Sequence, residues 1–168
     1  MLQLILGGAR SGKSRLAEKL ASDSALPVIY IATSQPLDGE MNQRVALHRQ
    51  RRPDHWGLIE EPIELARVLR ENAAPERCLL VDCLTLWLTN QMMAEAPIAP
   101  AVADLIESLA ESPAALVVIS NEVGQGIVPD NALARRFRDE AGWMHQKVAA
   151  AADRVEVIWA GLPLSLKG

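Results

Sequence analysis

Short apolar runs alternate along the chain with longer segments in which apolar residues recur every three or four positions. The short runs predict β-strands at residues 2–6, 27–32, 56–60, 78–81, 114–119 and 155–159. The longer segments predict helices at residues 14–21, 39–50, 62–71, 84–93, 102–110 and 133–152. Strands that alternate with helices indicate an α/β fold whose sheet is mainly parallel and has helices on both faces.

Proline and glycine positions set the expected boundaries. Pro62 suits the first turn of a helix, whereas Pro97 and Pro100 are expected to separate the helix at 84–93 from the next one, which starts at Val102. Residues 120–131 form a glycine-rich loop, and residues 161–168 are expected to be an irregular tail. No internal repeat or linker interrupts the pattern, so residues 1–168 are predicted to form one domain.

Charge and composition exclude several function classes. The net charge of −4 and the pI near 5.4 argue against a broad nucleic-acid surface, which requires a basic face. No stretch is long and apolar enough to span a membrane, and the apolar run at residues 1–6 is too short for a signal peptide, so we expect a cytoplasmic protein. Cys78 and Cys83 stand in apolar runs and are expected to be buried, reduced thiols.

A phosphate-binding loop follows the first strand. The pattern Gly-x-x-x-x-Gly-Lys-Ser is complete here, in Gly7, Gly8, Ala9, Arg10, Ser11, Gly12, Lys13 and Ser14. Glycines let backbone N–H groups approach phosphates, and the start of the next helix adds its positive dipole end. Lys13 is predicted to reach the β- and γ-phosphates and Ser14 to bind Mg²⁺, whereas Arg10 could contact phosphate or solvent.

Asp82 ends the strand at residues 78–81 and allows two interpretations. In phosphate-loop enzymes a carboxylate at this point holds Mg²⁺ directly or through water, but an Asp can also cap the next helix. The phosphate loop upstream favours the metal role. Thr85 could be a cap partner or a ligand contact.

His48 lies on the predicted helix at 39–50, on one stripe with Met41 and Val45. A histidine there is commonly a packed core residue. The flanking arginines favour a phosphate-bearing substrate instead, because a neutral imidazole can attack phosphorus and carry a nucleotidyl group. These arginines are Arg44, Arg49, Arg51 and Arg52. His145, on the long helix at 133–152, is expected to have only a packing or surface role.

The loop after the strand at 114–119 combines polar residues with glycines. Loops at the carboxyl ends of parallel strands form the ligand sites of such sheets, so Asn121 and Glu122 are expected to face the cleft. The alternative is a structural turn that leads into the next helix.

Several segments together resemble one family, the bifunctional adenosylcobinamide kinase/adenosylcobinamide-phosphate guanylyltransferases of cobalamin biosynthesis. The similar stretches are GGARSGKSRLAE at 7–18, YIATSQPLDGEM at 30–41, RVALHRQRRPDHW at 44–56, LLVDCLTLWLTN at 79–90 and SNEVGQGIVPDNALARRFRDEAG at 120–142. The phosphate loop alone is generic, whereas the ATSQ, HRxxRP and NEVGxGIVP segments are specific in combination.

The resemblance implies a RecA-like P-loop NTPase fold, a homotrimer and two activities. The enzyme would phosphorylate adenosylcobinamide with GTP or ATP and Mg²⁺, and then transfer GMP from GTP to that phosphate through a guanylylated His48. Further nucleotide-binding positions on this basis are Ala32, Thr33, Ser34, Arg49, Gln50, Arg51, Arg52, Glu60 and Asp82. A carboxylate at Glu60 would accept from the guanine N–H donors, although it could also cap a helix beside Pro62.

Two alternative functions stay open on sequence grounds. One is another P-loop small-molecule kinase without nucleotidyl transfer, from which the chemistry of His48 would distinguish this protein. The other is a RecA-like ATPase module that acts on protein or nucleic-acid partners, and the acidic pI disfavours it.

Overall fold

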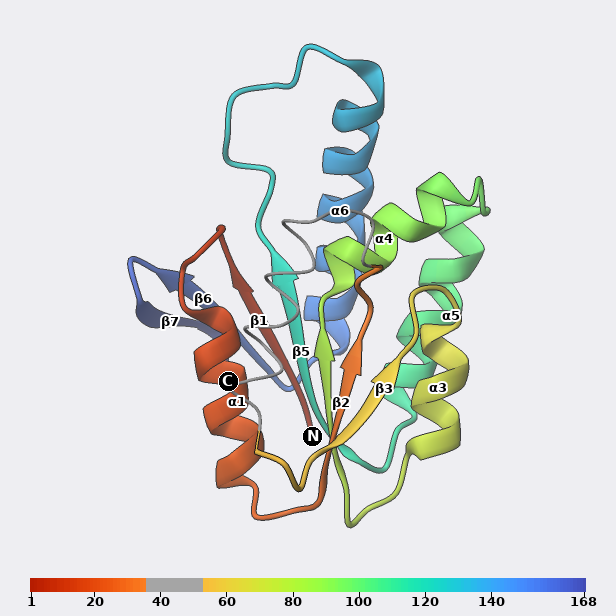
Figure 1. Ribbon diagram of the computed structural model, residues 1–168. Helices are drawn as coiled ribbons and strands as arrows, with labels where there is room; N and C mark the ends of the chain where they lie inside the picture. The colour runs from red at the N-terminus through yellow and green to blue at the C-terminus, as the bar shows by residue number, and fades with distance from the viewer. Residues whose placement is uncertain (36–52) are drawn as a thin grey trace.

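A twisted sheet forms the centre of the computed structural model, which describes residues 1–35 and 53–168. Its strand order is β3-β2-β4-β5-β1-β6-β7 (Figure 1). The strands are β1 Leu2–Gly7, β2 Val28–Ala32, β3 Gly57–Glu60, β4 Cys78–Asp82, β5 Ala115–Asn121, β6 Arg154–Trp159 and β7 Leu162–Lys167. The helices are α1 Lys13–Asp23, α3 Leu65–Asn72, α4 Leu84–Met93, α5 Ile98–Ala110 and α6 Ala132–Ala151.

All neighbouring strands pair in parallel except β6 and β7, which pair antiparallel. Helix α1 covers one face of the sheet, where Ala17 and Ala21 pack with Ile5. Helices α3, α4, α5 and α6 cover the other face, where Leu4 and Leu105 share one apolar core. Successive strand residues point to opposite faces, so Leu4 and Ile5 belong to different cores. The predicted α/β fold class, with a mainly parallel sheet and helices on both faces, is confirmed.

The prediction of an irregular tail at residues 161–168 is wrong, because β7 extends the sheet there. Ala160 and Gly161 form the connecting turn, both with positive φ, at 52° and 82°. Pro163 pairs opposite Ile158 on this outermost strand. A proline is tolerated in that place because an edge strand has one row of N–H groups that need no partner in the sheet.

The expected helix start at Pro62 is also wrong, since α3 begins at Leu65. Glu61 explains the delay, because its Oε1 accepts from the backbone N–H groups of Ile63 and Glu64, both at 2.9 Å. The carboxylate thus satisfies donors just ahead of the first helical turn.

Helix α5 begins at Ile98 rather than at the predicted Val102, and Pro100 lies in its first turn. A proline fits this position because the N–H groups of a first turn have no intrahelical acceptor. The helix predicted at 39–50 lies outside the described residues.

The two cysteines are buried and free, as predicted. Burial raises the pKa of the Cys83 thiol to about 11, and the charge of Asp82 adds to this effect. Burial also raises the pKa of Cys78. Across residues 1–35 and 53–168, no helix combines the length and apolar character needed to cross a membrane.

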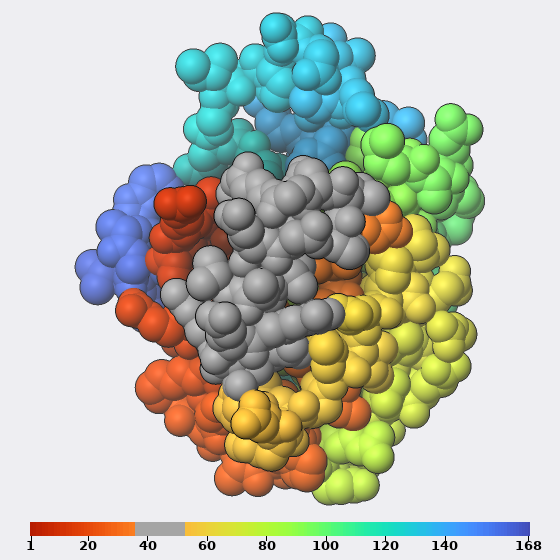
Figure 2. All heavy atoms as spheres, in the orientation of Figure 1, coloured from red at the N-terminus to blue at the C-terminus, as the bar shows by residue number. Residues whose placement is uncertain are grey.

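Residues 122–131 extend beyond the carboxyl ends of the strands, and we call this segment the arm (Figures 1 and 2). The arm leads into α6, whose first turn is capped by Asn131, where Oδ1 accepts from Ala134 N at 2.7 Å. Arg135 Nη1 donates to the carbonyls of Pro129 and Asp130 and so holds the arm against the helix. Ile127 in the arm is 97% exposed.

Candidate nucleotide site

The phosphate loop connects β1 to α1, and glycine is required at its first residue. A Cβ on Gly7 would lie 2.5 Å from Ser11 Oγ and 3.1 Å from the carbonyl oxygen of Ile158. Gly12 has a φ of 101°, a conformation that glycine adopts without strain. Arg10 is exposed and also has a positive φ. The sequence pattern therefore encodes a tightly folded loop.

Lys13 is the first residue of α1 and is only 8% exposed. Its Nζ donates to the carbonyl of Gly8 at 2.9 Å, so the ammonium stands inside the loop. Burial lowers the pKa of Lys13, and the negative charge of Asp82 opposes that shift. A buried ammonium inside a glycine-rich loop at a helix start is suited to bind a polyphosphate.

Two serines complete the loop. Ser11 Oγ is buried and has no hydrogen-bond partner among the described residues. An unpaired buried hydroxyl costs free energy that a phosphate oxygen could offset by accepting its hydrogen bond. Ser14 is half-buried at the second position of α1.

Asp82 is the last residue of β4, and the Tyr30 hydroxyl donates to its Oδ2 at 2.7 Å. The N-cap of α4 is Cys83, and no side chain caps this helix, so the alternative of Asp82 as a helix cap is wrong. A serine hydroxyl and a carboxylate are the hard oxygen donors that Mg²⁺ prefers. Within residues 1–35 and 53–168, no group of three or more His, Cys, Asp or Glu could hold a metal alone.

The ends of β3, β2 and β4 lie in one row, since Ala32 pairs with Glu60 on one side and with Asp82 on the other. Thr33 follows Ala32 and is fully buried. Its Oγ1 donates to Cys83 O at 2.8 Å and accepts from Cys83 N at 2.9 Å. The structure thus uses the Thr33 hydroxyl to join two strand ends, while the next residue, Ser34, is half-buried.

Not every predicted residue can be placed. Glu60 is exposed at the end of β3, two strands from Asp82 in the sheet order. Residues His48, Arg49, Gln50, Arg51 and Arg52 lie outside the described residues. Of the predicted side chains, the structure brings Lys13, at the start of α1, near Asp82, at the end of β4, since the charge of Asp82 acts on the pKa of Lys13.

Comparison with known proteins places the chain in a family. Residues 3–166 match the family described as cobinamide kinase / cobinamide phosphate guanyltransferase. The chain belongs to this family. It is 55% identical over 170 residues to the bifunctional adenosylcobalamin biosynthesis protein CobP of Pseudomonas aeruginosa, covering 100% of this chain and 98% of that protein. It is 41% identical over 182 residues to the bifunctional adenosylcobalamin biosynthesis protein CobU of Escherichia coli, covering 99% of this chain and 100% of that protein.

A solved structure from Pyrococcus horikoshii is similar in fold. It is 12% identical in sequence and has a TM-score of 0.58, with 99% of this chain and 86% of that one covered. At this identity the likeness concerns the fold alone. The similarity to the cobinamide enzymes, in contrast, is a similarity of sequence. It extends over almost the whole chain and not only over the separate motifs.

Polar residues that support this family's site were missed by the sequence analysis. Tyr30 was treated only as a strand residue, although it holds Asp82. Asn90 Nδ2 donates to Thr33 O at 2.7 Å and to Pro62 O at 3.1 Å, and so ties α4 to the strand ends. An asparagine within the apolar helix at 84–93 was the signal that could have revealed this role, because buried polar groups require partners.

His145 behaves as predicted, as a packing residue. It is buried, and its Nε2 lies 2.7 Å from Ser120 Oγ. Burial lowers the pKa of His145, and Glu122 opposes the shift. The imidazole is therefore neutral near pH 7.

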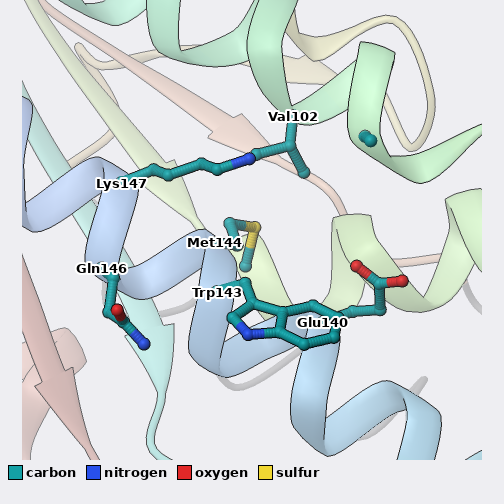
Figure 3. Close-up of a pocket in the computed structure, with 7 residues that line it drawn as sticks. Val102, Glu140, Trp143, Met144, Gln146 and Lys147 are labelled. Atoms are coloured by element: carbon teal, nitrogen blue, oxygen red, sulfur yellow. The ribbon is translucent and has the colours of Figure 1, made fainter.

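A cavity of about 310 Å³ lies between α5 and α6 on the far face of the sheet (Figure 3). Its lining includes Val102 from α5 and Glu140, Trp143, Met144 and Lys147 from α6. The lining contains no residue of the phosphate loop or of the strand ends. The candidate site is therefore the loop and strand-end region, and this cavity is separate from it.

Proposed function

We propose that the protein phosphorylates the aminopropanol hydroxyl of adenosylcobinamide with GTP or ATP and then transfers GMP from GTP to the resulting phosphate. Membership of the cobinamide kinase / guanyltransferase family supports both activities. The observation that carries the proposal is the complete phosphate loop with Lys13 inside it and Asp82 nearby. Both proposed steps break a phosphoanhydride bond, which this arrangement is suited to stabilise.

Lys13, Ser14 and Asp82 have separate roles in this proposal. Lys13 moves from the Gly8 carbonyl to the β- and γ-phosphates, where its charge follows the charge that develops on the leaving group. Ser14 and Asp82 would hold Mg²⁺, and Tyr30 keeps the Asp82 carboxylate in place. When bound, the ion neutralises phosphate charge and aligns the phosphates.

His48 is proposed as the carrier of GMP. A neutral imidazole nitrogen attacks the α-phosphorus of GTP, the bond to the bridging oxygen breaks, and pyrophosphate leaves. The phosphate of adenosylcobinamide phosphate then attacks the same phosphorus and releases the histidine. We further propose that Arg49, Gln50, Arg51 and Arg52 contact the phosphates, and that Ala32, Ser34 and Glu60 contact the nucleotide, with Glu60 on the guanine. Thr33, which was also predicted to bind the nucleotide, is fully buried and holds Cys83 instead.

Intact mass after incubation with GTP and Mg²⁺ tests the carrier. The parent should gain one GMP, bound through a phosphoramidate that is labile in acid and stable in base. His48→Ala should show no adduct and no guanylyl transfer, yet keep part of its kinase activity, because the γ-phosphate passes directly to the substrate hydroxyl. His55→Ala, in the exposed turn after residue 52, is the matched control. An adduct that persists in His48→Ala, or is absent from the parent, would exclude this residue.

We also propose a homotrimer. Four large apolar side chains around β7 are more than half exposed and form what we call the β7 patch, namely Trp159, Leu162, Leu164 and Leu166. The arm carries a second exposed apolar group, Ile127 and Val128. Figure 2 shows the arm and the β6–β7 hairpin at separate parts of the molecule. Contact between two different surfaces builds a closed ring when the rotation closes, and we propose that the arm of one subunit meets the β7 patch of the next in a ring of three.

The patch lies close to the proposed site, because a Cβ at Gly12 would be only 3.9 Å from the Cα of Gly161 in the β6–β7 turn. Light scattering should give the mass of three chains for the parent. Leu164→Lys should lower that mass, whereas Leu58→Lys, at the opposite edge of the sheet, should not. A parent that is monomeric would contradict the trimer.

We propose the cytoplasm as the place of action and adenosylcobinamide, not nucleic acid, as the partner. The net charge of −4 and the two free, buried cysteines support this assignment. GTP turnover should rise with the corrinoid and stay unchanged with DNA.

A further inference from the structure

Asn121 stands between the two halves of the proposed site. It ends β5, which lies between β4 and β1 in the sheet. Asn121 pairs with Gly7, the first residue of the phosphate loop, while Asp82 pairs with Ile119 two residues earlier on the same strand. The next residue, Glu122, donates its backbone N–H to Gly7 O at 3.0 Å. The Asn121 side chain is thus fixed at a strand end between the triphosphate loop and the metal-binding carboxylate.

The amide nitrogen of the Asn121 side chain is held by buried residues at the start of α4. Asn121 Nδ2 donates to Thr85 Oγ1 at 2.9 Å and lies 3.8 Å from Cys83 Sγ. Thr85 Oγ1 also lies 3.3 Å from the backbone nitrogen of Asn121. Thr85 and Cys83 are both buried. With its nitrogen bound to these two residues, the planar amide directs Oδ1 away from them, and Asn121 itself is half-buried.

The chemistry of Oδ1 limits what it can contact. An amide oxygen only accepts hydrogen bonds, and phosphate oxygens are acceptors too, so Oδ1 is not a phosphate ligand. Its partner is therefore an N–H or O–H donor, or Mg²⁺, for which Ser14 and Asp82 are already the proposed oxygen donors. In phosphoryl transfer to an alcohol, the attacking hydroxyl is the donor that has to stand next to the γ-phosphate.

We propose that Asn121 positions the acceptor hydroxyl of the kinase substrate by accepting its hydrogen bond through Oδ1. This inference rests on the proposed kinase activity. The hydroxyl oxygen attacks the γ-phosphorus, the bond to the bridging oxygen breaks, and the nucleoside diphosphate leaves. The amide is too weak a base to keep the proton, which passes to an oxygen of the transferred phosphoryl group. Thr85 does not contact the substrate in this proposal; it is a positioning residue that accepts the hydrogen bond of the Asn121 amide.

Separate assays of the two chemistries test the role. Asn121→Ala should lower kcat of the kinase step about 10- to 100-fold, as expected for the loss of substrate orientation. The rate of GMP-adduct formation from GTP should stay within about twofold, because no acceptor alcohol takes part in that step. The Kd for the nucleotide should also be unchanged.

Thr85→Val keeps the shape of the side chain but removes the hydroxyl. It should lower the kinase kcat less than Asn121→Ala, and it should have no further effect when Asn121 is already Ala, since the two residues act as one unit. Thr89→Val, one turn along α4 on its exposed side, is the matched control.

The outcomes separate this inference from the function on which it rests. A normal kinase kcat in Asn121→Ala would overturn the role of Asn121 and leave the proposed function intact. Equal losses of kinase activity, adduct formation and thermal stability would also overturn it, because they would show a structural role. A parent without kinase turnover would overturn both. A kinase-specific loss in Asn121→Ala that removes the effect of Thr85→Val is the supporting result.

Discussion

The two faces of the sheet differ in what covers them and in what they do. Helices α3 to α6 cover one face with an aliphatic core in which Leu69, Leu88 and Leu105 have no exposed surface. The other face, among the described residues, carries α1 as its helix, and its core includes the polar Tyr30 and the thiol of Cys83. Tyr30 holds Asp82, and α1 starts with Lys13, the proposed phosphate ligand.

This difference indicates that stability and chemistry are largely separated in space. Apolar burial contributes roughly 25 cal/mol per Å², so the face with more buried aliphatic area contributes more to the free energy of unfolding. The face with α1 instead holds a buried ammonium and a carboxylate, which cost free energy to desolvate. Substitutions on the two faces should therefore change different measured quantities.

The largest expected effect is that of Lys13→Ala on catalysis. Removing this charge should lower both activities by about 10²-fold or more, since preorganised electrostatic contacts are of that size. The free energy of unfolding should not fall, because the variant no longer buries an ammonium. Turnover and urea denaturation measure the two quantities. Lys19→Ala, an exposed position on the same helix, is the control, and near-normal turnover of Lys13→Ala would refute the nucleotide site.

Leu105→Ala on the other face should do the reverse. The loss of a fully buried leucine should lower the free energy of unfolding by about 2–5 kcal/mol. The nucleotide Kd of the folded protein should stay close to the parent value. Met93→Ala removes a side chain of similar size that is exposed at the end of α4, and it should change stability by less than about 0.5 kcal/mol. A large shift of nucleotide affinity in Leu105→Ala would contradict the separation.

Asp82→Asn tests the metal role with a smaller effect. The change keeps the shape and the Tyr30 contact but removes the charge, so the apparent Mg²⁺ affinity should fall by about tenfold, within the range for charged contacts of 1–3 kcal/mol. Mg²⁺ titrations of turnover measure it, with the exposed Asp23→Asn as control. If the Mg²⁺ titrations of parent and variant superimpose, Asp82 does not bind the metal.

The smallest expected effect is the pH dependence of stability that His145 causes on the face covered by α3 to α6. Burial lowers the pKa of His145, so the unfolded state binds a proton at a higher pH than the folded state does. Stability should therefore be complete above the unfolded pKa, about 6.5, and fall as the pH drops below it, until the folded pKa is reached. The loss is about 1.4 kcal/mol for each unit of lowering.

His145→Asn should flatten this slope, because it removes the titrating group while keeping a hydrogen-bonding side chain beside Ser120. Urea denaturation at several pH values between 8 and 5 gives the comparison. Since His48 and His55 are present in both proteins, their contributions cancel in the difference. Parallel pH profiles of the two proteins would show that burial of His145 does not affect stability.

Local patterns allowed much of this to be predicted. The phosphate loop is set by eight consecutive residues, and β1, β4 and β5 are short apolar runs, bounded by glycine, polar or proline residues, which predict buried strands. The pattern also predicted Asp82 at the mouth of the loop, since carboxyl ends of parallel strands meet at one edge. The roles of His48 and its neighbouring arginines stay predictions.

The sequence by itself determined the fold class, the loop and the family, because these depend on period, spacing and contiguous motifs. The tertiary structure alone determined which polar groups meet. Tyr30 and Asp82 are 52 positions apart, and Thr85 and Asn121 are 36 apart, so no local pattern encodes their hydrogen bonds. The same holds for β7, where Leu162 and Leu164 became a strand only because β6 offered its free edge. Strand pairing joins whichever edges the fold brings together, and only the packed chain specifies those edges.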